Sequence, residues 1–146
     1  MKKVALLSAL FFCAVLATAQ SAYADNWAML NEVNSTVDAR VEKATSFLVT
    51  KLSLEADQIA QISKIQKEAA ENVDAIIGLK ASDKEKFAAK ELNVINHMDR
   101  QIFSILKEKQ AVSYKRVLAE RQSNSKLDAI QQRQQKAKLQ QAFDKN

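Results

Sequence analysis

The sequence contains no proline, a single glycine and a single cysteine, Cys13. Proline and glycine mark the turns between short strands, so their near absence excludes a protein built from many strands and tight turns. A lone cysteine excludes an internal disulfide framework and a metal site made of cysteines. The chain must therefore derive its stability from the packing of helices.

Residues 1–24 have the order of a secretory signal peptide. They begin with two lysines, continue with the apolar run 4–17 and end in small residues at Ala22 and Ala24. The apolar run is shorter than the roughly 20 residues that span a bilayer. We predict cleavage before Asp25, which removes the cysteine, and we expect the mature protein in the periplasm.

The mature chain carries a mild excess of positive charge. Without the two leader lysines, 20 basic residues face 17 acidic ones, a net charge of about +3. A basic balance raises nucleic acid as a partner, but export removes that contact, so we expect no nucleic-acid partner. Acidic polypeptides fit better, and a membrane surface is an alternative through the basic tail.

Residues that favour helices dominate the mature chain, chiefly Ala, Leu, Lys, Gln and Glu. Apolar residues recur at steps of three and four, which predicts helices over residues 27–51 and 54–76. Ser53 is the expected N-cap of the second helix, and Gly78 is the expected stop. We therefore predict an all-α fold of about four helices.

Ser82 and Glu85 have the spacing of a capping box, which predicts the start of a third helix. Its apolar stripe continues into a fourth helical segment with no proline or glycine between them, so one bent helix is an alternative. We predict a helical domain over residues 25–122. Residues 123–146 form a glutamine-rich tail with few apolar anchors, which is expected to be a frayed helix or disordered.

One short sequence pattern occurs twice in the chain, in two segments that lie 52 positions apart. Leu54 and Gln58 frame the first segment, and Leu106 and Gln110 frame the second. Both read leucine, three residues, glutamine. Two unrelated amphipathic helices can share such spacing, so coincidence is the alternative explanation.

Over residues 45–122, this repeat in a small exported helical protein resembles the Leu-Thr-x-x-Gln motif of the Spy/CpxP family. The resemblance implies an elongated, bent helical hairpin that pairs as an antiparallel dimer. It also implies a chaperone without ATP, a regulator of envelope-stress sensors or a metal binder. Glu55 and Lys107 replace the motif threonines. Glu55 suits the first turn of a helix, whereas Lys107 does not, so we expect a weaker helix break at the second motif.

Catalysis has no support in the sequence. It contains no glycine-rich phosphate loop and no nucleophile motif. The single histidine, His97, has Asp99 two residues away, which places the two side chains on different faces of a helix. The family members that bind metal carry histidines one helical turn apart, and this chain lacks such a pair. We therefore expect no enzyme, no cofactor and no metal site.

Long helices that are too few to enclose a round core leave apolar residues near solvent or in a dimer seam. Such patches commonly bind partners. The candidate client-binding residues are Phe47, Ile76, Ile77, Phe87, Phe103, Lys64 and Lys67. We expect a homodimeric periplasmic chaperone that binds unfolded or misfolded proteins without ATP. The alternatives are a stress regulator that binds a sensor kinase domain, a metal sensor and a structural protein at the membrane surface.

Overall fold

The structure is a computed structural model, and it describes residues 25–143. These residues form six helices and no strand, which confirms the predicted all-helical fold. The helices are α1 Asn26–Leu30, α2 Val37–Leu52, α3 Ala56–Ile76, α4 Leu79–Ser82, α5 Lys84–Ile105 and α6 Glu108–Phe143. Four of them are long, and α1 and α4 are short. The predicted signal peptide lies outside the described residues.

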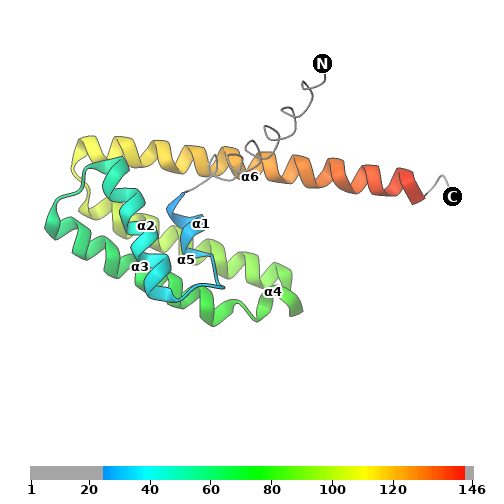
Figure 1. Cartoon of the computed structure of the whole chain (residues 1–146), viewed down its shortest axis with the longest axis horizontal. Coiled ribbons are helices and arrows are strands. Elements are labelled where there is room, and N and C mark those ends of the chain that lie inside the picture. The colour runs from blue at the N-terminus through cyan, green and yellow to red at the C-terminus, as the bar shows by residue number, and fades with distance from the viewer. Residues whose placement is uncertain (1–24, 144–146) are drawn as a thin grey trace, which may run out of the picture.

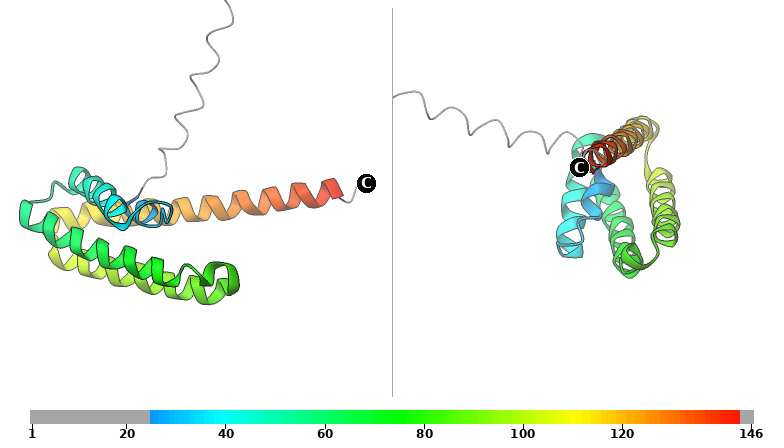
Figure 2. Two further views of the ribbon diagram at one scale, coloured as in Figure 1. Left: turned by 60° about the horizontal axis from the view of Figure 1, so that its bottom comes forward. Right: turned by 90° about the vertical axis from the view of Figure 1, so that its right-hand side faces the viewer.

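The first three long helices pack in chain order, and the fourth returns to the first. Helix α2 packs against α3, α3 packs against α5, and the first part of α6 lies against α2. Helices α3 and α5 run side by side, and α2 and α6 cover them (Figures 1 and 2). The short α1 contacts α2 and α3. The molecule is therefore an elongated bundle whose halves meet at the turns that precede α3 and α6.

The first predicted helix is in fact two helices. The chain leaves the helical conformation after Leu30 and re-enters it at Val37. Thr36 is the N-cap of α2, because its Oγ1 accepts a hydrogen bond of 3.3 Å from the backbone N–H of Ala39. Polar side chains such as Asn34 favour such a turn by competing with helical hydrogen bonds. The expected single helix over 27–51 is therefore wrong.

Ser53 ends α2 instead of capping α3. Its backbone is left-handed, with φ at 51°, and its N–H donates to the carbonyl of Val49 at 3.0 Å. The N-cap of α3 is Glu55. Leu54 lies between them and is buried, so the turn is held in place by its side chain.

The third long helix also begins one residue later than expected. Asp83 is the N-cap of α5, and its Oδ1 accepts from the N–H of Lys86 at 3.0 Å. Ser82 belongs to α4, where its hydroxyl donates to the carbonyl of Gly78. The Asp83 carboxylate, which the helix dipole favours, takes the capping position that the sequence assigned to Ser82. Helix α3 ends at Ile76, close to the predicted stop.

Apolar stripes from all the long helices converge on one core. Its largest fully buried side chains are Leu30, Leu48, Ile62, Val73, Met98, Ile102 and Tyr114. Burying an aliphatic side chain of this size stabilises a fold by about 1.5–3 kcal/mol. The core therefore includes a residue of the short α1 as well as residues of α2, α3, α5 and α6.

Helix α6 continues far beyond the body of the molecule. It runs without a break through Ser123, and residues 126–143, which we call the arm, project away from the other helices (Figure 2). All arm side chains with a described exposure are exposed, including Leu127 at 45% and Ile130 at 50%. The polar tail is thus the second half of one continuous helix as far as Phe143.

Candidate functional site

The two repeated motifs contact each other in the folded chain. Gln58 Nε2 donates to Gln110 Oε1 at 2.8 Å, and Gln110 Nε2 donates to Gln58 Oε1 at 2.9 Å. Each glutamine also donates to the residue before the other motif, Gln58 to the carbonyl of Ile105 and Gln110 to the carbonyl of Ser53. Equivalent residues of the two turns, Ser53 with Ile105 and Gln58 with Gln110, are 52 positions apart, and their contacts are reciprocal. The two turns are therefore related by approximate two-fold symmetry.

Each glutamine also caps its own helix. Gln58 Oε1 accepts from the N–H of Glu55 at 3.0 Å, and Gln110 Oε1 accepts from the N–H of Lys107 at 2.9 Å. The Lys107 ammonium forms an ion pair with the Glu55 carboxylate, and this contact raises the pKa of Lys107. The residues at the second position of the two repeated segments therefore carry complementary charges.

These contacts correct the expectation for the second motif. The helical conformation is interrupted between Ile105 and Glu108, and the backbone of Leu106 is extended, with ψ at 140°. A single bent helix across this region is therefore wrong. The break does not need a capping side chain at Lys107, because Gln110 supplies the hydrogen-bond acceptor from one turn further on.

A second cluster of contacts fixes the start of the described chain to α5 and α6. Arg121 donates to Asp25 at 3.3 Å, to the side chain of Asn26 at 2.9 Å and to Asp99 at 3.0 Å. Its side chain is 12% exposed, and those of the two aspartates are 11% and 14% exposed. Asp25 is also the N-cap of α1, because it accepts from the N–H of Trp27 at 2.7 Å. One guanidinium therefore joins three helices.

Tyr114 completes this cluster. Its hydroxyl donates to Asp99 at 2.6 Å, and its ring meets Phe103 edge-on, with centroids 5.1 Å apart. Burial, and then the charge of Asp99, raises the pKa of the Tyr114 phenol. Burial acts to lower the pKa of Arg121, but Asp99 and its other partners raise it by more. Both groups are therefore protonated at neutral pH.

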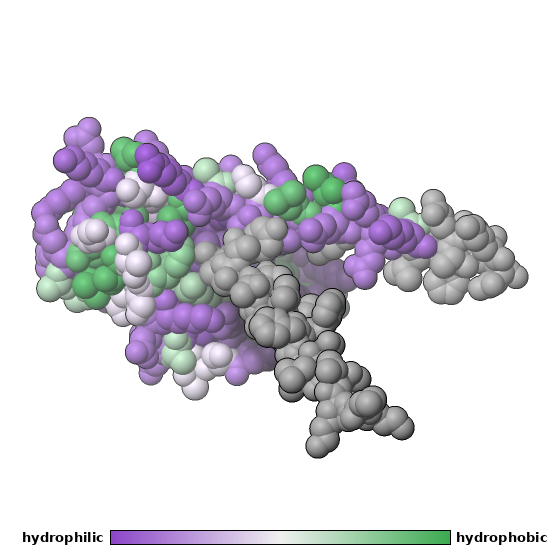
Figure 3. Space-filling view, turned by 45° about the horizontal axis from the view of Figure 1, so that its top comes forward, coloured by the Kyte–Doolittle hydropathy of each residue, from purple (hydrophilic) through white to green (hydrophobic). Residues whose placement is uncertain are grey.

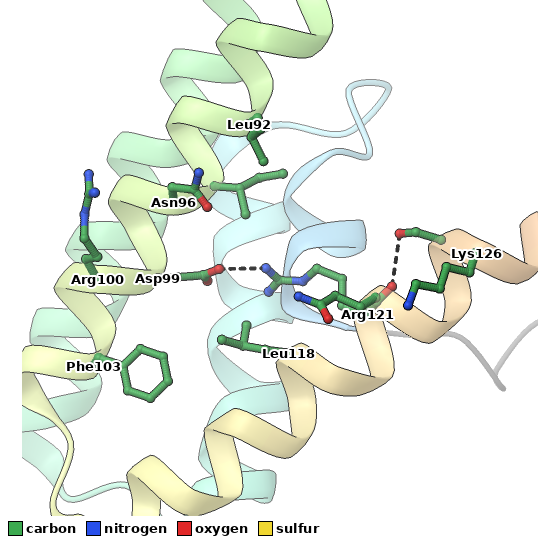
Figure 4. A pocket seen from close by; sticks show the side chains of 11 residues that line it. Leu92, Asn96, Asp99, Arg100, Phe103, Leu118, Arg121 and Lys126 are labelled. Carbon is green, nitrogen blue, oxygen red and sulfur yellow. Dashed lines mark hydrogen bonds and ion pairs between the residues drawn. The ribbon is translucent and has the colours of Figure 1, made fainter. Parts of the chain in front are cut away.

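A groove of about 630 Å³ opens on this cluster, where α5 and α6 diverge. Its apolar lining comes from Leu92, Ile95, Phe103 and Leu118. The Phe103 ring and Leu118 face the space between the helices, with Arg121 beside them (Figure 4). Leu92 is 55% exposed although it is a large apolar residue. The groove thus exposes apolar surface above a buried ion-pair network.

Two more cations line the groove. Lys126 lies on α6, and Arg100 lies on the outer side of α5 (Figure 4). Neither forms an ion pair with another residue in 25–143. Elsewhere, on the face shown in Figure 3, apolar residues form small patches within a mainly hydrophilic surface. The groove therefore combines an apolar lining with positive charge at its edges.

The seven candidate client-binding residues do not gather on one surface. Six of them lie on α2, α3 and α5, and Ile77 is the residue that follows α3. Among the seven, only Phe103 lines the groove. Phe87 is 7% exposed under the ammonium of Lys80, which lies 5.8 Å from the ring centre, so it offers no contact in this conformation. Phe47, Ile76 and Ile77 are half-buried. Lys64 and Lys67 are exposed on α3, and Lys67 forms an ion pair with Asp38.

The described residues contain no cluster of three or more histidine, cysteine, aspartate or glutamate side chains that could hold a metal ion. His97 is exposed and lines a shallow hollow between α3 and α5. Comparison with protein-family models, curated proteins and solved structures finds no match. Membership of the Spy/CpxP family therefore stays a prediction. Within residues 25–143, no helix has the length and apolar character needed to cross a membrane.

Sequence reasoning missed the groove and the residues beneath it. Arg121 lies in sequence among charged and polar residues, and its partner Asp25 is 96 positions away. No local spacing relates the two. Leu92 falls at a spacing that suits the apolar stripe of its helix, but it is 55% exposed where α6 turns away from α5. Only Asp25 could have been recognised from the sequence, as an N-cap, because aspartate is among the residues that favour the start of a helix.

Proposed function

We propose that the protein is a periplasmic chaperone that works without ATP and holds apolar segments of unfolded or misfolded envelope proteins. The observation that carries this proposal is the groove between α5 and α6. A large apolar side chain that is 55% exposed, Leu92, stands at this groove beside Ile95, Phe103 and Leu118. Exposed apolar surface that borders polar residues is typical of a site that binds other polypeptides.

The charges at the groove support a capture mechanism. Arg100 and Lys126 attract acidic stretches of a client at a distance and raise the rate of encounter. The apolar lining then adds a contact that is small in area, so the complex dissociates without an energy source. Release in the periplasm requires such weak binding, because that compartment has no ATP supply to drive it.

The test is light scattering from a chemically denatured client that is diluted into buffer with increasing amounts of the mature chain. Suppression of scattering without ATP at a near-equimolar ratio is the expected result. Leu92→Ser should weaken this suppression. The matched control is Leu127→Ser, which alters another exposed leucine, on the arm. No suppression at several-fold excess of the mature chain would refute the proposal.

Other outcomes separate the remaining candidates. Saturable binding to a sensor kinase domain, without any effect on misfolded clients, would favour a stress regulator. A gain of helix on anionic vesicles would favour a membrane-surface protein that uses the basic arm. The homodimer is also a proposal, and sedimentation equilibrium of the mature chain measures it.

A further inference from the structure

Two arginines hold the short helix α1 at its two ends. At its N-terminal end, Arg121 contacts Asp25 at 3.3 Å and Asn26 at 2.9 Å. At its C-terminal end, Arg40 Nη1 donates to the carbonyl of Leu30 at 2.9 Å. Arg40 is 1% exposed and also pairs with Asp74 on α3. Asn31, the C-cap of α1, donates to Glu91 of α5 at 2.9 Å. Helix α1 therefore occupies a site whose polar contacts come from α2, α5 and α6.

The segment in this site has a distinct chemistry. An acidic residue, Asp25, comes first, and it is followed by the apolar residues Trp27, Met29 and Leu30, which are 7%, 9% and 0% exposed. The site thus binds one carboxylate through a guanidinium and three apolar side chains through the core. The same guanidinium lines the groove between α5 and α6 (Figure 4). The α1 site and the groove are therefore continuous at Arg121.

Several features make α1 exchangeable. It has five residues, and so short a helix is not stable by itself. The loop that connects it to α2 is polar, and residues 32–36 are exposed. The Nε of Arg40, whose Nη1 binds the carbonyl of Leu30, is buried and has no hydrogen-bond partner within residues 25–143. Buried polar groups are nearly always paired, so α1 leaves one donor of its site unsatisfied.

We propose that α1 is a built-in occupant of a peptide-binding site, and that client segments with an acidic residue followed by apolar residues displace it. This inference rests on the proposed chaperone function, because it names the class of client and the part of the chain that competes with it. Displacement frees Arg121 for the client carboxylate and extends the groove toward the core. In the absence of client, α1 keeps these apolar surfaces covered.

The chain supplies its own probe. Trp27 is the only tryptophan in the sequence, and it is buried. Its fluorescence emission therefore reports whether α1 is docked. The titrant is a capped peptide, Asp-Asn-Phe-Ala-Met-Leu, which copies α1 with phenylalanine in place of tryptophan. We expect a saturable red shift of the Trp27 emission. A peptide with asparagine in place of the aspartate, and a scrambled peptide, should act only at much higher concentration.

Asp25→Asn tests the competition from the side of the protein. Asparagine still caps a helix, so the variant removes the charge contact with Arg121 and keeps the fold of α1. The peptide concentration for half-maximal red shift should fall about tenfold. Asp128→Asn, which removes an exposed carboxylate on the arm, should leave it unchanged. Circular dichroism checks that both variants keep their helix content.

The same titration with a tryptophan-free denatured client separates this inference from the proposed function. Suppressed scattering together with a red shift supports both. Suppressed scattering with an unchanged Trp27 emission at saturation overturns the role of α1 and leaves the chaperone function intact. A red shift with the peptide but no suppression for any client would overturn the client assignment along with the proposed function.

Discussion

Gln58 and Gln110, which are 52 positions apart in the sequence, donate a hydrogen bond to each other. Each amide also accepts from a backbone N–H of its own turn and donates to a backbone carbonyl of the other turn. Gln58 is 3% exposed, so water cannot readily replace these partners. The two helix starts therefore depend on one shared pair of side chains.

Replacing either glutamine should destabilise the fold. Gln58→Ala removes the side-chain partner of the Ile105 carbonyl and of the Glu55 N–H, together with both hydrogen bonds to Gln110, which should lower the free energy of unfolding by about 2 kcal/mol. Urea denaturation measures the change. Adding Gln110→Ala should cost less than the sum of the two single changes, because both remove the same contact. Gln61→Ala, an exposed position on α3, is the control and should have almost no effect.

The Glu55 and Lys107 ion pair should contribute little to stability. Both side chains are more than half exposed, at 55% and 65%. Exposed pairs are screened by water and salt. The double change Glu55→Thr and Lys107→Thr, which removes both charges and leaves the two glutamines in place, should leave the denaturation midpoint nearly unchanged. A large loss of stability would mean that the charges, and not the glutamines, hold the two turns together.

Tyr114 should make the fold sensitive to alkali. Its pKa is raised in the folded state by burial and by Asp99. A raised folded-state pKa gives stability that is fully present below the unfolded value of about 10 and is lost as the pH rises above it. We expect unfolding to become easier above pH 10. Tyr114→Phe should remove that part of the pH dependence, although loss of the hydrogen bond to Asp99 lowers stability at neutral pH.

The tyrosine titration itself can be followed directly. Tyr114 is the only tyrosine after residue 24, so tyrosinate absorbance of the mature chain reports this group alone. Ionisation should coincide with the loss of helical circular dichroism. Ionisation of a fully folded chain near the ordinary pKa would contradict the buried placement.

The arm should be dispensable for the stability of the body. Its described side chains are exposed, and α6 packs against α2 only in its first part. A chain that ends at Ser125 should keep its unfolding free energy within about 0.5 kcal/mol, because surface changes rarely exceed that value. Its helical circular dichroism should fall in proportion to the residues removed. A drop of several degrees in the melting temperature would show that the arm packs on the body or on another copy.

The sequence predicted the class of fold and much of the core, because apolar spacing determines which face of a helix is buried. It failed where side chains compete for the same backbone group. Ser53 and Ser82 were expected to be the N-caps, but Glu55 and Asp83 occupy those positions. At the second motif a weaker helix break was expected because Lys107 is a poor cap, but the Gln110 side chain accepts from the Lys107 N–H instead. Which candidate prevails depends on neighbours that are distant in sequence.

The groove could not be predicted from the sequence for a related reason. Its exposure depends on the angle at which α6 leaves α5, and that angle is fixed by buried contacts such as the one between Tyr114 and Asp99. Both positions look ordinary in the sequence. The partner of Arg121 at the start of the chain is likewise invisible to any pattern with a period of three or four.

The length of the arm also amplifies any tilt of α6 at the base of the arm. Its 18 residues span about 27 Å at 1.5 Å per residue, so a tilt of about 10° at its base moves its far end by about 5 Å. Arg121, which lies just before the arm on α6, is tied to the start of α1. A small rearrangement of α1 that tilts α6 would therefore become a large displacement at the far end of the helix.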